Sequence, residues 1–392
     1  MTTNPDNVVQ FPAARSQRNG RLLIPARLRD ARKFLRLSQE ELGDKIGVTR
    51  QAVSQFERGD RKPDAATFAA IVNALDQPSG FFTTDDAPNF GKFSTRFYRK
   101  FGSDTVRRRE ACDTSAEWLV QVAKVFDNAI NYPDVKIPNY DFAEFGEDGI
   151  DDIAEQVRSD WGLGLGPISN VLALLESHGV IVCRYEMTGE NVEAFSFWNG
   201  SRPFIFMASE KTAGVRSRYD LAHELGHLVL HRHIDSADIE NKDFLKEIER
   251  QADRFAGAFL LPKHSFPNEV FTPRLDAFVN LKMRWRVSVQ AMIYRCSDLG
   301  IFDDAQILNM RKQVSFRKWR TKEPLDDPSI IPLEMPRLLS KAFDLVAKSG
   351  RMGVEELKQA IPINPRIIEA MCNLQVGALA GTDPPLLEPT LK

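Results

Sequence analysis

The chain has 392 residues, which at about 100–200 residues per domain predicts two to four domains. Hydrophobic residues make up 43% and charged residues 27% of the chain, a composition typical of globular proteins that excludes collagen-like and wholly disordered classes. The formal net charge of −2 excludes a protein-wide basic field for nucleic acid, so any basic surface must be local.

The cysteines and the apolar runs exclude further classes of protein. Cys112, Cys183, Cys296 and Cys372 lie far apart and form no CxxC pair, which excludes a cysteine zinc knuckle and a dense disulfide framework. Isolated thiols of this kind indicate a reducing, cytoplasmic location. No apolar run approaches the length of about 18 residues that spans a bilayer, so we expect no membrane partner.

The first predicted elements are three short helices, over 27–36, 39–46 and 50–58. Ser38 precedes the second helix with Glu41 at the capping-box position, and Gly47 ends that helix. Thr49 is expected to cap the third helix, which ends at Gly59. Two short helices joined through a glycine turn are the pattern of a helix-turn-helix.

The local charge and a family resemblance indicate DNA as the partner. Residues 21–62 hold eleven basic and six acidic side chains, although the whole chain is slightly acidic. Within residues 22–76, the stretch LSQEELGDKIGVTRQAVSQFERGDRKPD resembles the Cro/C1-type (XRE) repressors. The resemblance implies that Gln39 touches a phosphate and that the following residues lie along double-stranded operator DNA: Arg50, Gln51, Ser54, Gln55 and Arg61. The alternative is a small helical bundle with a solvated polar face.

The pattern then changes from helical to mixed. A long helix is predicted from 103 or 104 to 130, another over 149–160, and a third from Pro167, in its first turn, to 177. Three short strands follow, over 180–185, 194–198 and 203–207, and we expect the last to be an edge strand. Two long helices are predicted over 214–233 and 243–261, and the remainder is mostly helical.

The first of these long helices carries an HExxH sequence. His223 and His227 are separated by four residues, so both imidazoles lie on one helix face and can reach one metal ion, with Glu224 beside them to polarise water. Zinc needs a third protein ligand, for which Glu249 on the next helix is the first candidate and Glu247 the alternative. Asp253, one turn after Glu249, is placed to accept the N–H of a ligand imidazole.

This stretch resembles the ImmA/IrrE family of zinc metallopeptidases. The resemblance is carried by RPFIFMASEKT, RYDLAHELGHLVLHRH and IERQADRFAGAFLLP. It implies that Zn²⁺ is bound by His223, His227 and Glu249 and that Glu224 is the general base. His231 lies further along the same helix, either packed or lining the cleft as an oxyanion donor.

Together these patterns predict a mostly α fold of the α+β class. It comprises an all-α helix-turn-helix bundle, a zincin-like domain with a small antiparallel or mixed sheet and two active-site helices, and a helical C-terminal region. The expected boundaries are a disordered leader over 1–20, a DNA-binding domain over 21–80, a linker and long helix over 81–140, a peptidase domain over 141–325 and the C-terminal region over 326–392.

Three functions are compatible with these residues. The first is a homodimeric DNA-binding regulator with a linked zinc endopeptidase that cuts itself, a partner repressor or another regulatory protein. The second is a repressor or antitoxin without proteolysis, whose peptidase-like domain senses a ligand or docks a partner. The third is a peptidase whose helix-turn-helix binds a protein.

Overall fold

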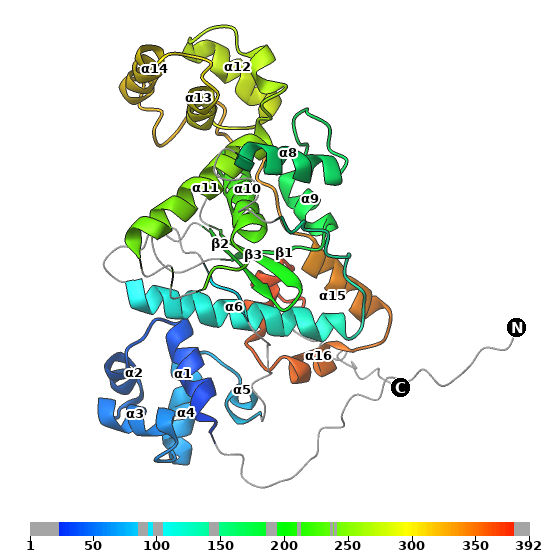
Figure 1. Cartoon of the computed structure of the whole chain (residues 1–392). Coiled ribbons are helices and arrows are strands. Elements are labelled where there is room, and N and C mark those ends of the chain that lie inside the picture. The colour runs from blue at the N-terminus through cyan, green and yellow to red at the C-terminus, as the bar shows by residue number, and fades with distance from the viewer. Residues whose placement is uncertain are drawn as a thin grey trace, which may run out of the picture. The chain divides into compact units, whose positions relative to one another are not determined.

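The computed structural model describes residues 23–84, 93–96, 105–140, 149–185, 194–209, 213–235, 238 and 241–379. The leader predicted over 1–20 lies outside these residues. The chain divides into two compact units, Met1–Ala87 and Pro88–Lys392. The described residues are mostly helical and include one small sheet, which confirms the predicted fold class (Figure 1).

The N-terminal unit is a bundle of short helices whose ends follow the predicted caps. Its helices are α1 Pro25–Phe34, α2 Gln39–Ile46, α3 Arg50–Arg58, α4 Ala65–Ala74 and α5 Ser79–Thr83. The Ser38 hydroxyl accepts from the Glu41 amide at 3.0 Å while the Ser38 amide donates to the Glu41 carboxylate at 2.6 Å, completing the capping box. Gly47 ends α2 with φ of 71°, a left-handed conformation that favours glycine.

A buried ion pair joins the first three helices of this unit. The Arg32 guanidinium on α1 donates to the Glu57 carboxylate on α3 at 2.5 and 3.0 Å. The side-chain amide of Gln39, the first residue of α2, donates to the same carboxylate at 2.9 Å. Because these groups lie far apart in sequence, the pair fixes the relative orientation of all three helices.

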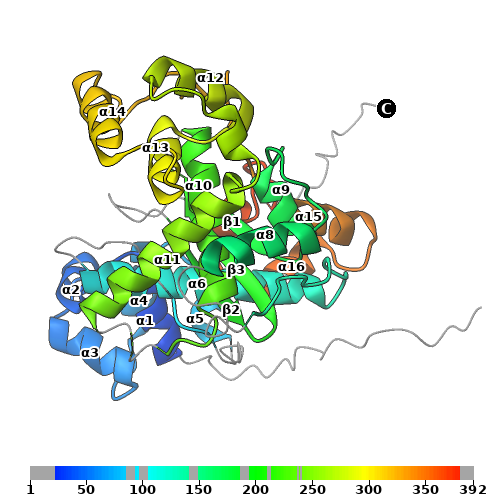
Figure 2. The ribbon, with the colours of Figure 1, turned by 45° about the horizontal axis from the view of Figure 1, so that its top comes forward.

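The second unit builds a sheet between helices. Its elements are α6 Thr105–Asp127, α8 Ile150–Asp160, α9 Val171–Ser177, β1 Ile181–Tyr185, β2 Ala194–Asn199, β3 Arg202–Ala208, α10 Gly214–Leu230, α11 Lys242–Leu260, a 3-10 turn Phe266–Glu269, α12 Leu275–Trp285, α13 Val289–Asp298, α14 Asp304–Phe316, α15 Leu338–Lys348, α16 Val354–Ala360 and α17 Pro365–Met371. Figure 1 shows α6 on one side of the sheet and α10 with α11 on the other. In the turned view of Figure 2, α8 lies beside α11.

The sheet has the order β1-β3-β2, so the prediction that the strand over 203–207 is an edge strand is wrong. β3 pairs parallel with β1 and antiparallel with β2, and Phe204 to Ala208 are all buried. A short, uninterrupted apolar run such as this one is typical of a strand whose two faces are both covered, so the run itself does not indicate an edge position. Within the described residues, the edges of the sheet are therefore β1 and β2.

The helix predicted to begin at Pro167 begins four residues later. Asn170 caps α9, because its side-chain oxygen accepts from the Ala173 amide at 2.7 Å. The backbone carbonyls of Ile168 and Ser169, which precede the helix, accept hydrogen bonds from the Arg218 side chain at 2.6 and 3.3 Å. The buried guanidinium thus holds 168–169 in a non-helical conformation that the local sequence could not reveal.

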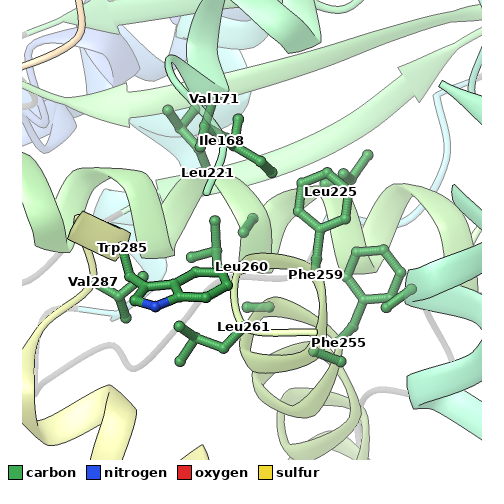
Figure 3. Close-up of a cluster of buried hydrophobic side chains, with 14 of the residues drawn as sticks. Ile168, Val171, Leu221, Leu225, Phe255, Phe259, Leu260, Leu261, Trp285 and Val287 are labelled. Carbon is green, nitrogen blue, oxygen red and sulfur yellow. The ribbon is translucent and has the colours of Figure 1, made fainter. Parts of the chain in front are cut away.

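The core of the second unit fixes the two long helices against each other. Leu221 and Leu225 of α10 lie in one cluster with Phe255 and Phe259 of α11, and all four are fully buried (Figure 3). At Gly226 the helices approach so closely that a Cβ atom would lie 3.2 Å from the Cα atom of Ala252. None of the described helices is both long and apolar enough to cross a membrane.

The segment over 323–334, between α14 and α15, is anchored by buried carboxylates. Glu323 and Asp326 accept from the buried Lys282 ammonium on α12 at 2.9 and 2.6 Å. The Glu334 carboxylate pairs with Arg218 of α10 and accepts from the Leu172 amide of α9 at 2.9 Å. The segment therefore connects three helices of the second unit.

Candidate metal centre and DNA-binding surface

Three potential ligands converge between α10 and α11. The Nε2 atoms of His223 and His227 lie 3.1 Å apart. The carboxylate oxygens of Glu249 are each 3.5 Å from one of these nitrogens. Ligands about 2.0–2.1 Å from a tetrahedral zinc ion are separated by about 3.3 Å. The donor set and its spacing therefore fit a zinc ion, and these three residues form the metal-ligating group found among the described residues.

Glu224, the residue after His223, lies beside this group. Its side chain is buried, and its Oε2 atom has no hydrogen-bond partner among the described residues. Burial raises the pKa of Glu224 to about 7, although the neighbouring His223 acts in the opposite direction. A carboxylate with a pKa near neutrality can both take up and release a proton at physiological pH.

Asp253 contacts the first histidine of the group. Its Oδ1 atom lies 2.8 Å from Nδ1 of His223, so that nitrogen carries the proton and Nε2 points to the other ligands. Burial lowers the pKa of His223, but hydrogen bonds to Asp253 and Glu249 outweigh burial and raise it to about 10. Burial raises the pKa of Glu249, but its contacts with His223 and His227 outweigh burial and hold that pKa well below its usual range.

His231 follows the last residue of α10 and has both ring nitrogens engaged. Nδ1 lies 2.9 Å from Nδ1 of His227, and Nε2 lies 3.0 Å from Oε1 of Gln251. Burial lowers the pKa of His231 to about 3, and the adjacent His227 adds to this effect. The structure therefore supports the packed alternative for His231, since neither nitrogen is left to donate to an oxyanion.

Glu247, the alternative third ligand, points elsewhere. Its carboxylate accepts from the Arg250 guanidinium at 2.8 and 2.9 Å and from the Gln251 amide at 2.9 Å. Glu249 lies two residues further along α11, and its carboxylate is near the two histidines. The geometry favours Glu249 as the ligand.

The sheet edge next to the metal-ligating group is β2. The Ser196 hydroxyl donates to the Glu224 carbonyl at 3.2 Å, and the Trp198 indole donates to the Leu228 carbonyl at 3.3 Å. One end of this edge is already paired, because the Ser94 amide donates to the Trp198 carbonyl at 2.9 Å. An extended peptide added to this edge would meet the chain's own segment over 93–96.

The residues predicted to face DNA gather on the outer side of α3. Arg50 and Gln51 are exposed, and Ser54 and Gln55 are half-buried. The opposite face of the helix is core, with the following residues buried: Ala52, Val53 and Phe56. An exposed polar face on the second helix of the motif has the geometry of a recognition helix.

Two further residues of the predicted DNA set lie nearby in the N-terminal unit. Arg61 is exposed, and its guanidinium carbon lies 5.8 Å from the centre of the Phe56 ring. Gln39 is half-buried and bonded to Glu57 through one N–H of its amide. Because an amide has two N–H groups, this bond is compatible with a phosphate contact through the other.

Comparisons with known proteins find a family match within each unit. The helix-turn-helix family matches residues 28–82, and the IrrE N-terminal-like domain, a peptidase family, matches residues 175–297. An uncharacterized HTH-type transcriptional regulator of Methanothermobacter thermautotrophicus is 42% identical over 48 residues, which is 12% of this chain and 70% of that protein. The chain belongs to the HTH-type transcriptional regulators.

Two other relatives carry the same description. An uncharacterized HTH-type transcriptional regulator of Sinorhizobium medicae is 35% identical over 68 residues, 17% of this chain and 48% of the relative. The regulator YqaE of Bacillus subtilis is 43% identical over 49 residues, 12% of this chain and 42% of the relative. The chain thus spans about half the length of these curated relatives.

In this HTH-type regulator the IrrE-like match spans the sheet and the helices α10 to α13. It contains the three residues of the metal-ligating group, together with Glu224. Sequence reasoning missed Gln251, which contacts His231. Its only signal is the four-residue spacing from Glu247 on one helix face, and that spacing is too common to be noticed without the fold.

Proposed function

We propose that this chain is a homodimeric transcription regulator that binds double-stranded operator DNA and carries a zinc-dependent endopeptidase in its second unit. Its substrate would be the chain itself, a partner repressor or another regulatory protein. A regulator of this kind would act on DNA in the cytoplasm. The observation that carries the proposal is the convergence of His223, His227 and Glu249 beside the buried carboxylate of Glu224.

The residues of the site divide the chemistry between them. His223, His227 and Glu249 would hold Zn²⁺, which supplies a Lewis acid that lowers the pKa of a bound water. Glu224 would take the proton of the attacking water at Oε2, the atom without a partner among the described residues. Asp253 holds His223 with its Nε2 atom toward the other ligands.

The DNA-binding half of the proposal rests on α3. Arg50 has the fork of donors that matches guanine, and Gln51 or Gln55 has the amide that matches adenine. Phosphate contacts from Gln39 and Arg61 would set the position of the helix without reading sequence. Helix-turn-helix proteins read two half-sites as dimers, which supports a homodimer.

The first test measures zinc per chain in the wild type beside His223→Ala and Glu249→Ala. We expect about one zinc in the wild type and loss of zinc in both variants, since each removes one of three protein ligands.

The second test measures cleavage. The zinc-loaded wild type, incubated alone and with candidate repressors, should yield a fragment. Glu224→Gln should reduce that cleavage by about 10²–10⁴-fold while keeping zinc, because it removes the base and leaves the ligands. Wild type without zinc after reloading would contradict the metal site.

A second function, regulation without proteolysis, is favoured by the sheet. A zinc peptidase would hold a substrate as an added strand on a free sheet edge. The strand over 203–207, expected to be an edge strand, is central, and one end of the β2 edge is paired with the segment over 93–96. In that case the peptidase-like unit would sense a ligand or dock a partner in a repressor or antitoxin. Glu224→Gln would then leave regulation of a reporter unchanged while Arg50→Ala abolishes it.

A further inference from the structure

A chain of hydrogen bonds leads from the surface of α11 to the second histidine of the metal-ligating group. The Gln251 amide donates to the Glu247 carboxylate at 2.9 Å, and its Oε1 atom lies 3.0 Å from Nε2 of His231. Nδ1 of His231 in turn lies 2.9 Å from Nδ1 of His227. We call these four residues the Gln–His relay. All but Glu247 are buried.

The direction of each bond in the relay follows from its outer end. A carboxylate can only accept, so the NH₂ group of Gln251 must face Glu247 and its oxygen must face His231. That oxygen also only accepts, so Nε2 of His231 carries a proton. An imidazole with its one proton on Nε2 accepts at Nδ1, so the proton between the two histidines then belongs to Nδ1 of His227, as metal binding through Nε2 of that ring requires.

The result is a defined tautomer of His227. With its proton on Nδ1, the lone pair of its Nε2 atom faces Nε2 of His223 and the Glu249 carboxylate. His223 is oriented by a shorter route, because Asp253 accepts from its Nδ1 directly. The two ligand histidines are therefore oriented by different partners, one by a carboxylate and one by a neutral amide acting through a third imidazole.

We propose that Gln251 is a positioning residue that acts through His231 to hold the Nδ1-protonated tautomer of His227 for metal binding. The proposal rests on the metal site of the proposed function and is independent of proteolysis. Hydrogen-bond partners of metal ligands fix ring orientation and tautomer, and their loss costs about 10–100-fold in metal affinity. The amide supplies this orientation without adding a charge next to the site.

The test compares Gln251→Met with Gln251→Glu in the full chain. Methionine has a similar length but offers no strong acceptor to His231, whereas glutamate keeps an oxygen there. Zinc affinity, measured by competition with a chelator, should fall about 10–100-fold in Gln251→Met and stay within about threefold of wild type in Gln251→Glu. Lys246→Met, at an exposed position of the same helix, is the matched control and should leave the affinity unchanged.

A second pair of variants addresses His231 itself. His231→Asn keeps an acceptor near the position of Nδ1, and we expect zinc affinity close to that of the wild type. His231→Leu removes the acceptor and should weaken zinc binding as Gln251→Met does. Equal affinities in all variants, or equal losses in the conservative and the apolar variant of each pair, would overturn the proposal.

The tautomers can also be measured without zinc. The chain has six histidines, so long-range proton–nitrogen NMR spectra of the histidine-labelled protein are tractable. We expect His231 protonated at Nε2 and His227 at Nδ1 in the wild type. The opposite tautomer at either ring would contradict the relay, even if the wild type binds zinc. If the wild type binds no zinc, the proposed function fails, and these spectra still decide the relay.

Discussion

In the N-terminal unit the side chains expected to contact DNA lie on the solvent side of α3, whereas in the second unit the two histidines of the metal-ligating group and the adjacent glutamate are buried. Arg50 and Gln51 are exposed, but His223, His227 and Glu224 each have 3% or less of their surface accessible. The exposed set depends on one helix whose ends are fixed by local caps. The buried set depends on contacts between elements.

This difference in burial predicts which substitutions each unit tolerates. On α3 the polar face can change without cost to the core, because its buried residues lie on the opposite side. In the metal-ligating group, each histidine contacts a further residue, Asp253 for His223 and His231 for His227. A change there alters position and affinity together.

The largest expected effect on stability concerns the buried Arg32–Glu57 pair. This pair is an exception to the contrast above, because through it the N-terminal unit also depends on a contact between distant residues. Glu57→Ala leaves Arg32 buried without its carboxylate and should lower the free energy of unfolding of this unit by about 3–5 kcal/mol. Asp60→Ala, which breaks the exposed pair with Arg58, is the control and should cost less than about 1 kcal/mol.

Two probes can separate the units in one urea titration of the full chain. All five tryptophans follow residue 88, so their fluorescence reports on the second unit, whereas far-ultraviolet circular dichroism reports on both. Glu57→Ala should create an early transition in circular dichroism and leave the tryptophan transition in place. A shift of both transitions would show that the two units unfold together.

A smaller effect on the free energy of unfolding is expected at Gly226, where α10 packs closely against α11 beside the metal-ligating group. In Gly226→Ala the new methyl group would lie 3.2 Å from Ala252 Cα and from Phe255 Cδ1, so α10 and α11 must move apart. Such crowding costs about 1–3 kcal/mol, which exceeds the helix propensity gain of about 1 kcal/mol.

The matched control for this change is Gly257→Ala on the facing helix. Its methyl group would lie 3.7 Å from the Arg295 side chain, an ordinary contact, so propensity should raise stability by up to about 1 kcal/mol. We expect an earlier tryptophan transition and weaker zinc retention in Gly226→Ala alone. Equal behaviour of the two variants would contradict the tight approach of α10 and α11.

The smallest effect on stability is expected for Arg50→Ala. This variant tests whether an exposed side chain of α3 can affect DNA binding while leaving stability unchanged. The residue is exposed on α3, so unfolding should be unchanged. Affinity for a site selected from random DNA should fall by about 1–3 kcal/mol, because one base contact is lost. Lys45→Ala removes a charge from exposed α2 and should weaken selected and random DNA alike; the same pattern in Arg50→Ala would exclude base recognition.

Local patterns were sufficient wherever the determinants lie within about one helical turn. The bounds of α2 and α3 follow from Ser38, Gly47 and Thr49, and the structure confirms them. The four-residue spacing of His223 and His227 likewise predicts that they share a face, and their Nε2 atoms meet.

Distant contacts account for what the sequence could not predict. The central position of β3 depends on which strands pair, and the late start of α9 depends on Arg218. Gln251 orients His227 only because α11 crosses α10 next to His231. A spacing rule along one element contains no information about such crossings.

The carboxylates of the segment over 323–334 bear on how this protein could have been assembled from parts. The IrrE-like match ends at residue 297, yet Lys282 and Arg218 within it take their partners from Glu323, Asp326 and Glu334. A gene fusion that transferred only the matching region would leave both cations buried without counter-charges. The stretch of chain that must be transferred together is therefore longer than the matching region and extends to at least residue 334.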